Sequence, residues 1–177
     1  MNTSANQNGA VNQVSEYPPE QARRYYGKYR GIVSDVEAST CRIKAKVPSV
    51  LGDVESGWCL PCVPYAGPQV GIAFLPEEGS GVWIEFEGGD VSYPVWVGCY
   101  WREGEVPSAV AAGVKVIVTK SPNQLILDDD AGSITISDNN GNSVTLDTTG
   151  ITLSKGSQQV NVGDASVSVN DGALEVQ

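Results

Sequence analysis

The stretch Leu125-Ile-Leu-Asp-Asp-Asp-Ala-Gly-Ser-Ile-Thr-Ile-Ser-Asp-Asn-Asn-Gly-Asn-Ser-Val-Thr-Leu-Asp-Thr-Thr-Gly-Ile-Thr-Leu153 repeats one short pattern four times. Two aliphatic residues spaced two apart are followed by a run of turn residues. Residues two apart lie on the same face of an extended strand, so each pair predicts a very short strand with one apolar face. The connectors Asn140-Gly141 and Thr149-Gly150 are types that form tight turns. The stretch therefore predicts a series of short strands joined by turns.

The same pattern continues to Val176, and successive pairs begin seven to ten residues apart. This spacing is too short for a single-chain β-solenoid, whose coils need about twenty residues. A lone ribbon of such strands would expose its aliphatic row to water, and stacking against further copies buries that row. We therefore expect residues 107–177 to form an intertwined triple-stranded β-helix, a needle shared by a homotrimer. The residues expected on the needle axis are Leu125, Leu127, Ile134, Ile136, Val144, Leu146, Ile151, Leu153, Val160, Val162, Val167, Val169, Leu174 and Val176.

Residues 23–106 have a different composition. Every Phe, Trp and Tyr of the chain lies at or before Trp101, so the two regions need different kinds of core. The alternation within Val82–Phe86 places Val82, Ile84 and Phe86 on one face, which should fill the interior. About five strands without a helical period predict an all-β domain, a small OB-fold barrel, with a small sandwich as the alternative. The expected strands are Tyr25–Val36, Cys41–Val47, Trp58–Pro64, Gly71–Leu75, Val82–Phe86 and Val95–Tyr100.

The charge balance narrows the classes of partner. The chain has a formal net charge of −10 at pH 7. Nucleic acid and anionic membrane surfaces are therefore poor equilibrium partners. Residues 1–22 are polar and contain Pro18-Pro19, which predicts a flexible N-terminal arm. We expect no secretory signal, because no apolar run follows a basic start.

Two ordered blocks of sequence resemble a known family. The first block consists of Tyr26-Gly-Lys-Tyr-Arg-Gly-Ile-Val-Ser-Asp-Val36, Lys46-Val-Pro-Ser-Val-Leu-Gly52, Ser56-Gly-Trp58, Pro64-Tyr-Ala-Gly67, Leu75-Pro-Glu-Glu-Gly79, Val82-Trp-Ile-Glu-Phe-Glu-Gly-Gly-Asp90 and Pro94-Val-Trp-Val-Gly98. The second runs from Thr119-Lys-Ser121 through Leu125-Ile-Leu-Asp-Asp129, Ile134-Thr-Ile-Ser-Asp-Asn-Asn-Gly-Asn142 and Val144-Thr-Leu-Asp147 to Gly150-Ile-Thr-Leu153. Together they are similar to the phage baseplate assembly protein V and central tail spike family. Its OB domain also occurs in valine-glycine-repeat proteins of type VI secretion and in extracellular contractile injection systems.

The resemblance implies a virion or injection-particle baseplate protein, assembled in the cytoplasm of the producing cell. Such a spike docks on a trimeric hub and pierces the target envelope transiently when the sheath contracts. We expect the hub to be a separate protein, because only about 22 polar residues precede the barrel. The chain contains no His, so the iron-binding tip of some relatives is not expected, and a separate small PAAR-type tip protein should cap the needle. The alternative is a carbohydrate- or nucleic-acid-binding OB module with a β-rich tail.

Several motifs could carry chemistry, but each also has a structural explanation. Cys59-Leu-Pro-Cys62 with Cys41 and Cys99 has zinc or redox spacing, and the four are interpreted as buried thiols. The acidic pairs Glu77/Glu78 and Glu85/Glu87 are expected to be exposed, and Asp138-x-Asn140-x-Asn142 is expected to form a turn rather than a calcium loop. We therefore predict no enzyme and no catalytic, cofactor-binding or metal residues. Trp83 is the preferred hub or trimer contact on the barrel. The full set of expected contacts is Tyr26, Tyr29, Trp83 and Trp101.

Overall fold

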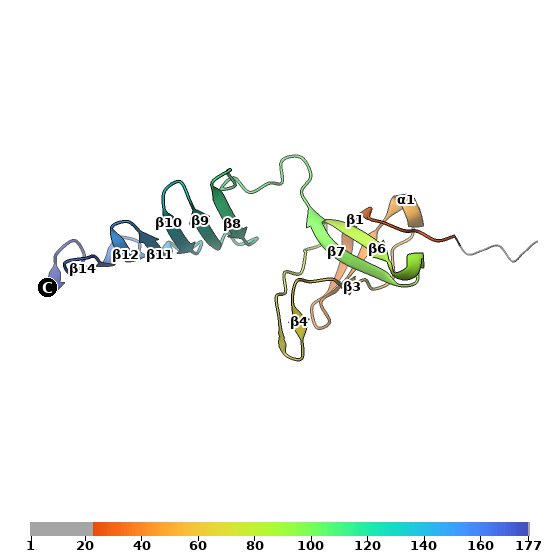
Figure 1. The fold of residues 1–177 in the computed structure, drawn as a ribbon, viewed down its shortest axis with the longest axis horizontal. Helices are drawn as coiled ribbons and strands as arrows, with labels where there is room; N and C mark the ends of the chain where they lie inside the picture. Colours follow the sequence, from red (N-terminus) through yellow and green to blue (C-terminus); the bar gives the residue numbers. More distant parts are fainter. Residues whose placement is uncertain (1–22, 177) are drawn as a thin grey trace, which may run out of the picture. The chain divides into compact units, whose positions relative to one another are not determined.

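The computed structural model describes residues 23–176 and is almost entirely β-structure (Figure 1). The chain divides between Arg102 and Glu103 into two compact units. The N-terminal unit contains a five-stranded sheet, and the C-terminal unit contains an eight-stranded sheet. The flexible arm expected at residues 1–22 lies outside the described residues.

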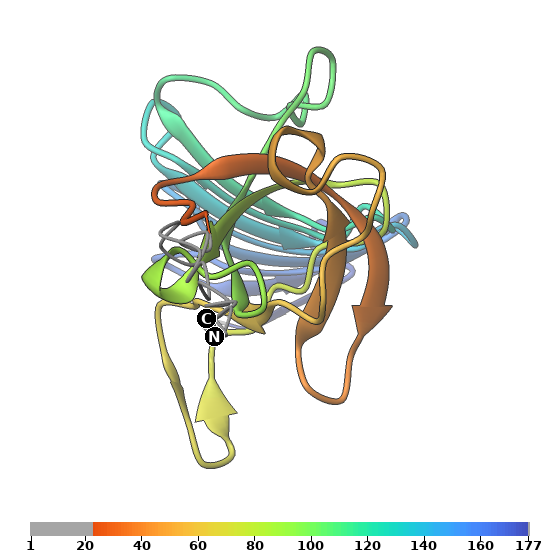
Figure 2. The ribbon, with the colours of Figure 1, turned by 90° about the vertical axis from the view of Figure 1, so that its right-hand side faces the viewer.

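The N-terminal unit is a small OB-like half-barrel. Its strands follow the order β2-β1-β6-β7-β3, in which β3 runs parallel to β7 and the other neighbours are antiparallel. Figure 2 shows this unit end on, with its strands curving around a shared interior. The strands are β1 (Tyr29–Glu37), β2 (Arg42–Lys46), β3 (Leu60–Pro61), β6 (Gly81–Phe86) and β7 (Pro94–Tyr100), and a separate hairpin pairs β4 (Ala66–Gly67) with β5 (Val70–Gly71).

The interior of this unit is filled as the strand alternation predicts. Val82, Ile84 and Phe86 on β6 are all buried, which confirms the inner face expected from the sequence. Trp96 also lies in the core, and its indole N–H donates a hydrogen bond to the carbonyl oxygen of Cys41 at 3.2 Å. A buried indole thus has its polar atom satisfied. The other core residues are Val33, Ile43, Ala45, Val47 and Cys59.

Three predicted strands of the barrel differ from the structure. The strand expected at Trp58–Pro64 spans only Leu60–Pro61. The first strand begins at Tyr29 rather than Tyr25, because Gly27 adopts a φ of 88°, which interrupts an extended strand. The predicted strand Gly71–Leu75 is wrong beyond Gly71. If the β4–β5 register continued, Ala73 would face Pro64, which has no amide N–H to donate.

Two short helices were not predicted from the sequence. Helix α1 spans Pro48–Leu51, with proline in its first turn and Gly52 at its end with a φ of 60°. Proline in the first turn and glycine just after the last are the usual start and stop signals, but one turn has no helical period to detect. The 3-10 turn η1 spans Glu87–Gly89 and leads toward β7. Within residues 23–176, no helix combines the length and hydrophobicity needed to cross a bilayer.

The C-terminal unit is a single antiparallel meander in which each strand pairs with the next along the chain. Tight turns join the strands, and Gly132, Gly141, Gly156 and Gly172 adopt positive φ values there, which other residues rarely do. The predicted series of short strands is therefore confirmed. The strands are β8 (Val114–Val118), β9 (Gln124–Asp128), β10 (Ser133–Ser137), β11 (Asn142–Asp147), β12 (Gly150–Lys155), β13 (Gln158–Val162), β14 (Val167–Val169) and β15 (Leu174–Val176).

Candidate trimer interface

The strand register places every aliphatic pair of the C-terminal sheet opposite the next pair. On β10 and β11, Ile134 faces Leu146 and Ile136 faces Val144. The same correspondence holds from β9 to β15, so the aliphatic side chains form two unbroken columns across the sheet. The first column is Leu127, Ile134, Leu146, Ile151, Val162, Val167 and Val176. The second is Leu125, Ile136, Val144, Leu153, Val160, Val169 and Leu174.

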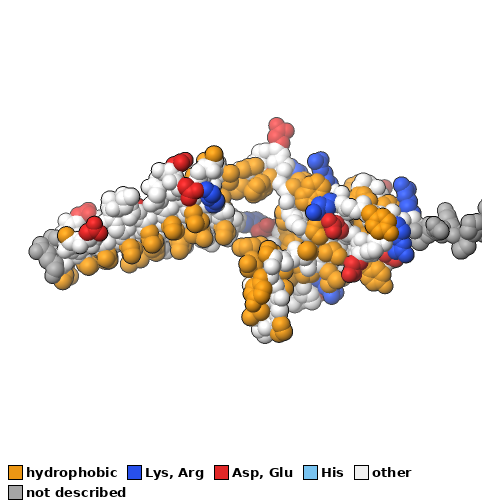
Figure 3. Space-filling model, viewed as in Figure 1, with side chains coloured by type: hydrophobic (Ala, Val, Ile, Leu, Met, Phe, Trp, Pro, Cys, Tyr) orange, Lys and Arg blue, Asp and Glu red, His pale blue; other side chains and the backbone are white. Residues whose placement is uncertain are grey.

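Among the described residues, no other element of the C-terminal unit packs over this apolar face. Its most open side chains range from 38% exposed at Val167 to 61% at Leu174. Figure 3 shows the hydrophobic side chains following one long edge of the sheet in that view. The fully buried apolar side chains among residues 23–176 all belong to the barrel. The sheet therefore has no core of its own, and burying the part of each aliphatic side chain that is still exposed would contribute about 1 kcal/mol.

The opposite face of the sheet carries small polar side chains suited to water. Thr135, Thr145, Thr152, Asn161 and Ser168 face one another across successive strands. The side-chain amide of Asn161 donates a hydrogen bond to the hydroxyl of Thr152 at 3.0 Å. Cross-strand hydroxyl and amide pairs of this kind stabilise a sheet without needing a partner layer. From β10 to β14 the two faces therefore differ sharply, whereas at β8 and β9 the opposite face also carries Val116 and Ile126.

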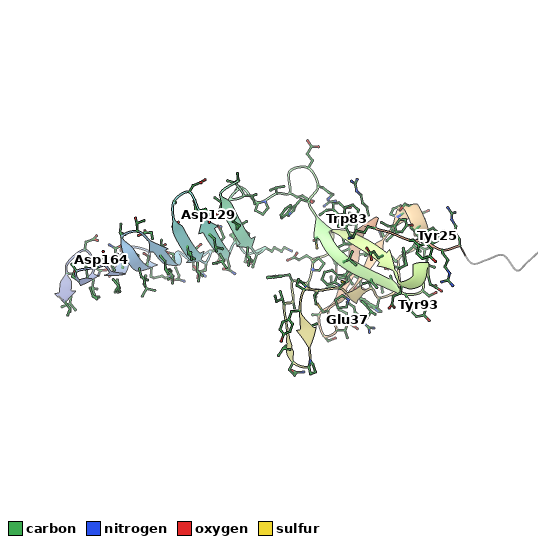
Figure 4. All side chains as sticks on the ribbon, viewed as in Figure 1. Tyr25, Glu37, Trp83, Tyr93, Asp129 and Asp164 are labelled. Atoms are coloured by element: carbon green, nitrogen blue, oxygen red, sulfur yellow. The ribbon has the colours of Figure 1, made fainter. Side chains whose placement is uncertain are left out.

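Two residues at the β8 end of the apolar face were missed by the sequence reasoning. Ile117 faces Leu125 and extends the second column by one strand, whereas Lys115 faces Leu127. The ammonium of Lys115 pairs with the carboxylate of Asp129, which is labelled in Figure 4. In β8, Val114, Val116 and Val118 alternate with Lys115 and Ile117, so alternation alone predicts that the valines form the apolar face. The pairing with β9 instead places Lys115 and Ile117 on the face of the aliphatic columns. A charged pair thus marks the β8 end of the first column.

The carboxylate of Asp138, the first position of the motif that resembles a calcium loop, is hydrogen-bonded within its own turn. Its Oδ1 accepts the backbone N–H groups of Asn140 at 2.8 Å and Asn142 at 2.9 Å. These hydrogen bonds, led by the one from Asn142, hold the pKa of Asp138 well below its usual range. Asp147 accepts from the hydroxyl and the N–H of Thr149, which lowers its pKa as well. The predicted turn chemistry is confirmed.

The four barrel residues expected at an interface fall into three different environments. Tyr26 and Trp101 are 71% and 62% exposed. Tyr29 is half-buried, because its ring packs on Phe86 at 5.8 Å between centroids. Trp83, labelled in Figure 4, is half-buried and packs on the Tyr100 ring at 5.1 Å. Tyr26 and Trp101 thus have the most surface free for a partner, Trp83 offers less, and Tyr29 mainly supports the core.

A cation extends the cluster around Trp83. The guanidinium of Arg30 lies 5.7 Å from the centroid of the Trp83 ring and 5.8 Å from that of Tyr100. The Tyr100 hydroxyl donates to the carbonyl oxygen of Gly31 at 3.3 Å. Because a hydrogen bond and two cation–π contacts hold these groups, their surface is preformed. The sequence predicts Trp83 as a contact residue, but it does not predict that Arg30 and Tyr100 pack against it.

The sequence predicts that all four cysteines are buried, but the structure fully buries only Cys59. All four are free thiols, and Cys59 is fully buried, which raises its pKa by desolvation. Cys41 is half-buried, whereas Cys62 and Cys99 are exposed, so the interpretation is wrong for these two. Residues three apart in an extended segment point to opposite faces, which explains why Cys59 and Cys62 differ. Among residues 23–176, no group of three or more Cys, Asp or Glu side chains is arranged to hold a metal ion.

The acidic pairs of the barrel lie where turn and strand geometry predicts. Glu77 and Glu78 are exposed at a turn closed by the hydrogen bond from Ser80 N to the Glu77 carbonyl oxygen at 3.1 Å. Glu85 lies 3.7 Å from the Lys28 ammonium, and both groups are largely solvated. Exposed pairs of this kind contribute little to stability. Their placement on the surface is confirmed.

Comparison with known families matches both units. Residues 29–101 match the type VI secretion system/phage-baseplate injector OB domain, and residues 115–175 match the phage baseplate V C-terminal trimerisation domain. No curated protein matches the chain. The second match agrees with a sheet whose aliphatic face is uncovered in one chain, and it identifies this unit as a trimerisation domain. Together the two matches cover most of the chain, which belongs to the phage baseplate V family of injector spike proteins.

Proposed function

We propose that this chain is the central spike of a contractile injection machine's baseplate, in a phage tail or a related particle. Three copies wind their C-terminal sheets around one axis with the aliphatic columns inward. The spike docks on a separate trimeric hub and pierces the target envelope when the sheath contracts. It is assembled in the cytoplasm of the producing cell and has no catalytic activity of its own.

One observation carries the proposal: the two continuous aliphatic columns of the C-terminal sheet are uncovered in a single chain. Three copies would bury them against one another and leave the Thr, Asn and Ser face in water. The match to a trimerisation domain supports three as the number of copies. The inward side chains are the fourteen of the two columns, together with Ile117 from β8.

The same arrangement suits a passive piercing device. Every strand from β9 to β14 is hydrogen-bonded to a neighbour on both sides, so few backbone groups are free to rearrange. A dry aliphatic interior resists water during passage through an envelope. Force would come from the sheath, and the needle has only to stay folded while it moves.

Each end of the spike needs a partner. At the barrel, the exposed rings of Tyr26 and Trp101 and the Trp83 cluster are the surfaces we assign to the hub or to neighbouring copies. At the other side, β15 has a neighbouring strand on one side only among the described residues, and Leu174 and Val176 are both exposed. Open apolar strand edges promote aggregation, so a small PAAR-type tip protein is the cap we propose.

A cryo-electron microscopy map of the particle that contains this chain tests the proposal. The expected result is threefold density for three copies on the particle axis, with the barrels on a separate hub and the needles pointing away from the tube. Density for the chain at the particle periphery, or a particle without a baseplate, would overturn the assignment. Oligonucleotide or glycan binding by a protein that occupies no baseplate would instead favour an OB binding module.

A further inference from the structure

The β4–β5 hairpin and its flanks form an uncharged, apolar projection from the barrel. No charged residue occurs between Glu55 and Glu77, although the chain as a whole carries a net charge of −10. Residues 63–75, here called the apolar finger, are anchored at their ends by Val63 and Leu75, which pack against the core. The remaining large side chains of the finger point away from that core. They are Tyr65, Val70, Ile72 and Phe74, from 45% to 64% exposed.

The apolar finger has little to hold it in shape by itself. Its ladder consists of two residue pairs, Ala66 with Gly71 and Gly67 with Val70, plus a hydrogen bond from Ile72 N to the Tyr65 carbonyl oxygen at 2.9 Å. Its turn places Gln69 at a φ of 60°, a conformation that side-chain-bearing residues rarely adopt. An isolated two-stranded hairpin is marginal in water, and soluble proteins seldom leave such an apolar patch uncovered.

We propose that the apolar finger packs against the barrel of a neighbouring copy of this chain, so that three fingers close a ring around the threefold axis. This inference rests on the proposed trimeric spike. Residues 101–113 connect the last barrel strand to the first needle strand and can span at most about 45 Å. Three barrels tethered this closely to one trimerisation domain meet at millimolar effective concentration, so a modest contact is enough to hold them together.

Charge favours a second copy over other occupants. Residues 23–101 carry nine Asp and Glu against seven Lys and Arg, so most other parts of the barrel surface would bring charged side chains into a contact between copies. The apolar finger carries no charge, so it can enter such an interface without a buried carboxylate. A head-to-tail contact, in which the finger of each copy meets a different surface on the next, closes into a ring when three copies are related by a threefold axis.

Photocrosslinking of the purified full-length chain tests this contact. The probe variant is Phe74→benzoylphenylalanine, and the matched control is Val54→benzoylphenylalanine at a barrel position 68% exposed. After irradiation, we expect dimer and trimer adducts on a denaturing gel from position 74 and only monomer from position 54. Monomer-mass products alone from position 74, or equal adducts from both positions, overturn the proposal.

A second variant separates this contact from trimerisation by the needle. Phe74→Asp should leave the trimeric mass unchanged by light scattering while lowering the midpoint of barrel unfolding relative to Val54→Asp. Equal midpoints for the two variants overturn the finger contact and leave the proposed spike standing. A wild-type chain that is monomeric throughout overturns both.

Discussion

At the scale of single residues, one side chain of the apolar face is enough to test which way the sheet faces. Leu146 lies between Ile134 and Ile151 in the first column, whereas its neighbour Thr145 belongs to the polar face. If the columns face the trimer axis, a charge at position 146 enters a dry interior in three copies. The same charge at position 145 stays in water.

Leu146→Asp should therefore abolish trimerisation, because burying an unpaired carboxylate costs several kcal/mol per charge. The matched variant Thr145→Asp should remain trimeric. Light scattering at micromolar concentration measures both masses. Trimers of Leu146→Asp as stable as those of Thr145→Asp would show that the aliphatic columns face outward.

Asp138 gives a pH-dependent test at the same scale. Its folded pKa lies below the ordinary 3.8 of an aspartate, because the N–H and side-chain amide of Asn142 donate to the charged carboxylate. A lowered pKa stabilises the folded state above the unfolded value, and that stability is lost as pH falls through the folded value. Asp138→Asn should lower the unfolding midpoint at pH 7, and its difference from wild type should shrink below about pH 4. A difference that is constant from pH 7 to pH 2 would contradict this account.

At the scale of elements, the meander depends on turns that bring each strand back in register. Gly150 begins β12 with a φ of 134°, and a Cβ added there would overlap the carbonyl oxygen of Val162 on β13. Gly156 in the next turn has a φ of 56°, and no atom lies within 4 Å of a Cβ added there. The two glycines are therefore required for different reasons. Gly150 allows strand contact, and Gly156 allows a turn conformation.

Gly150→Ala should lower the free energy of unfolding by about 3 kcal/mol, because β12 and β13 must move apart. Gly156→Ala should cost only about 1–2 kcal/mol, the penalty for a left-handed residue with a side chain. Thermal unfolding of the two variants compares them directly. Equal midpoints would mean that β12 and β13 do not pack as described.

The sequence predicted the elements whose pattern is periodic. Alternation in Val82–Phe86 gave the inner face of the barrel, and the spaced aliphatic pairs gave the strands from β9 to β15. It did not predict helix α1, which is too short to show a period, nor the end of pairing at Gly71, which depends on proline in the opposing segment. The exposure of Cys62 and the placement of Lys115 depend on tertiary register, which no local pattern records.

At the scale of the whole molecule, the two units have different requirements. The barrel buries its own core of Val33, Trp96 and their neighbours, so a single copy contains what it needs to fold. Among the described side chains of the C-terminal sheet, none is fully buried in one chain. Its folding and its association are therefore one process, and its stability should depend on protein concentration.

The mass of the full-length chain in solution tests this central claim most directly. Light scattering at micromolar concentration should give a trimer, three times the 18.7 kDa of one chain. A stable, folded monomer of 18.7 kDa at that concentration would contradict the shared needle and, with it, the proposed spike.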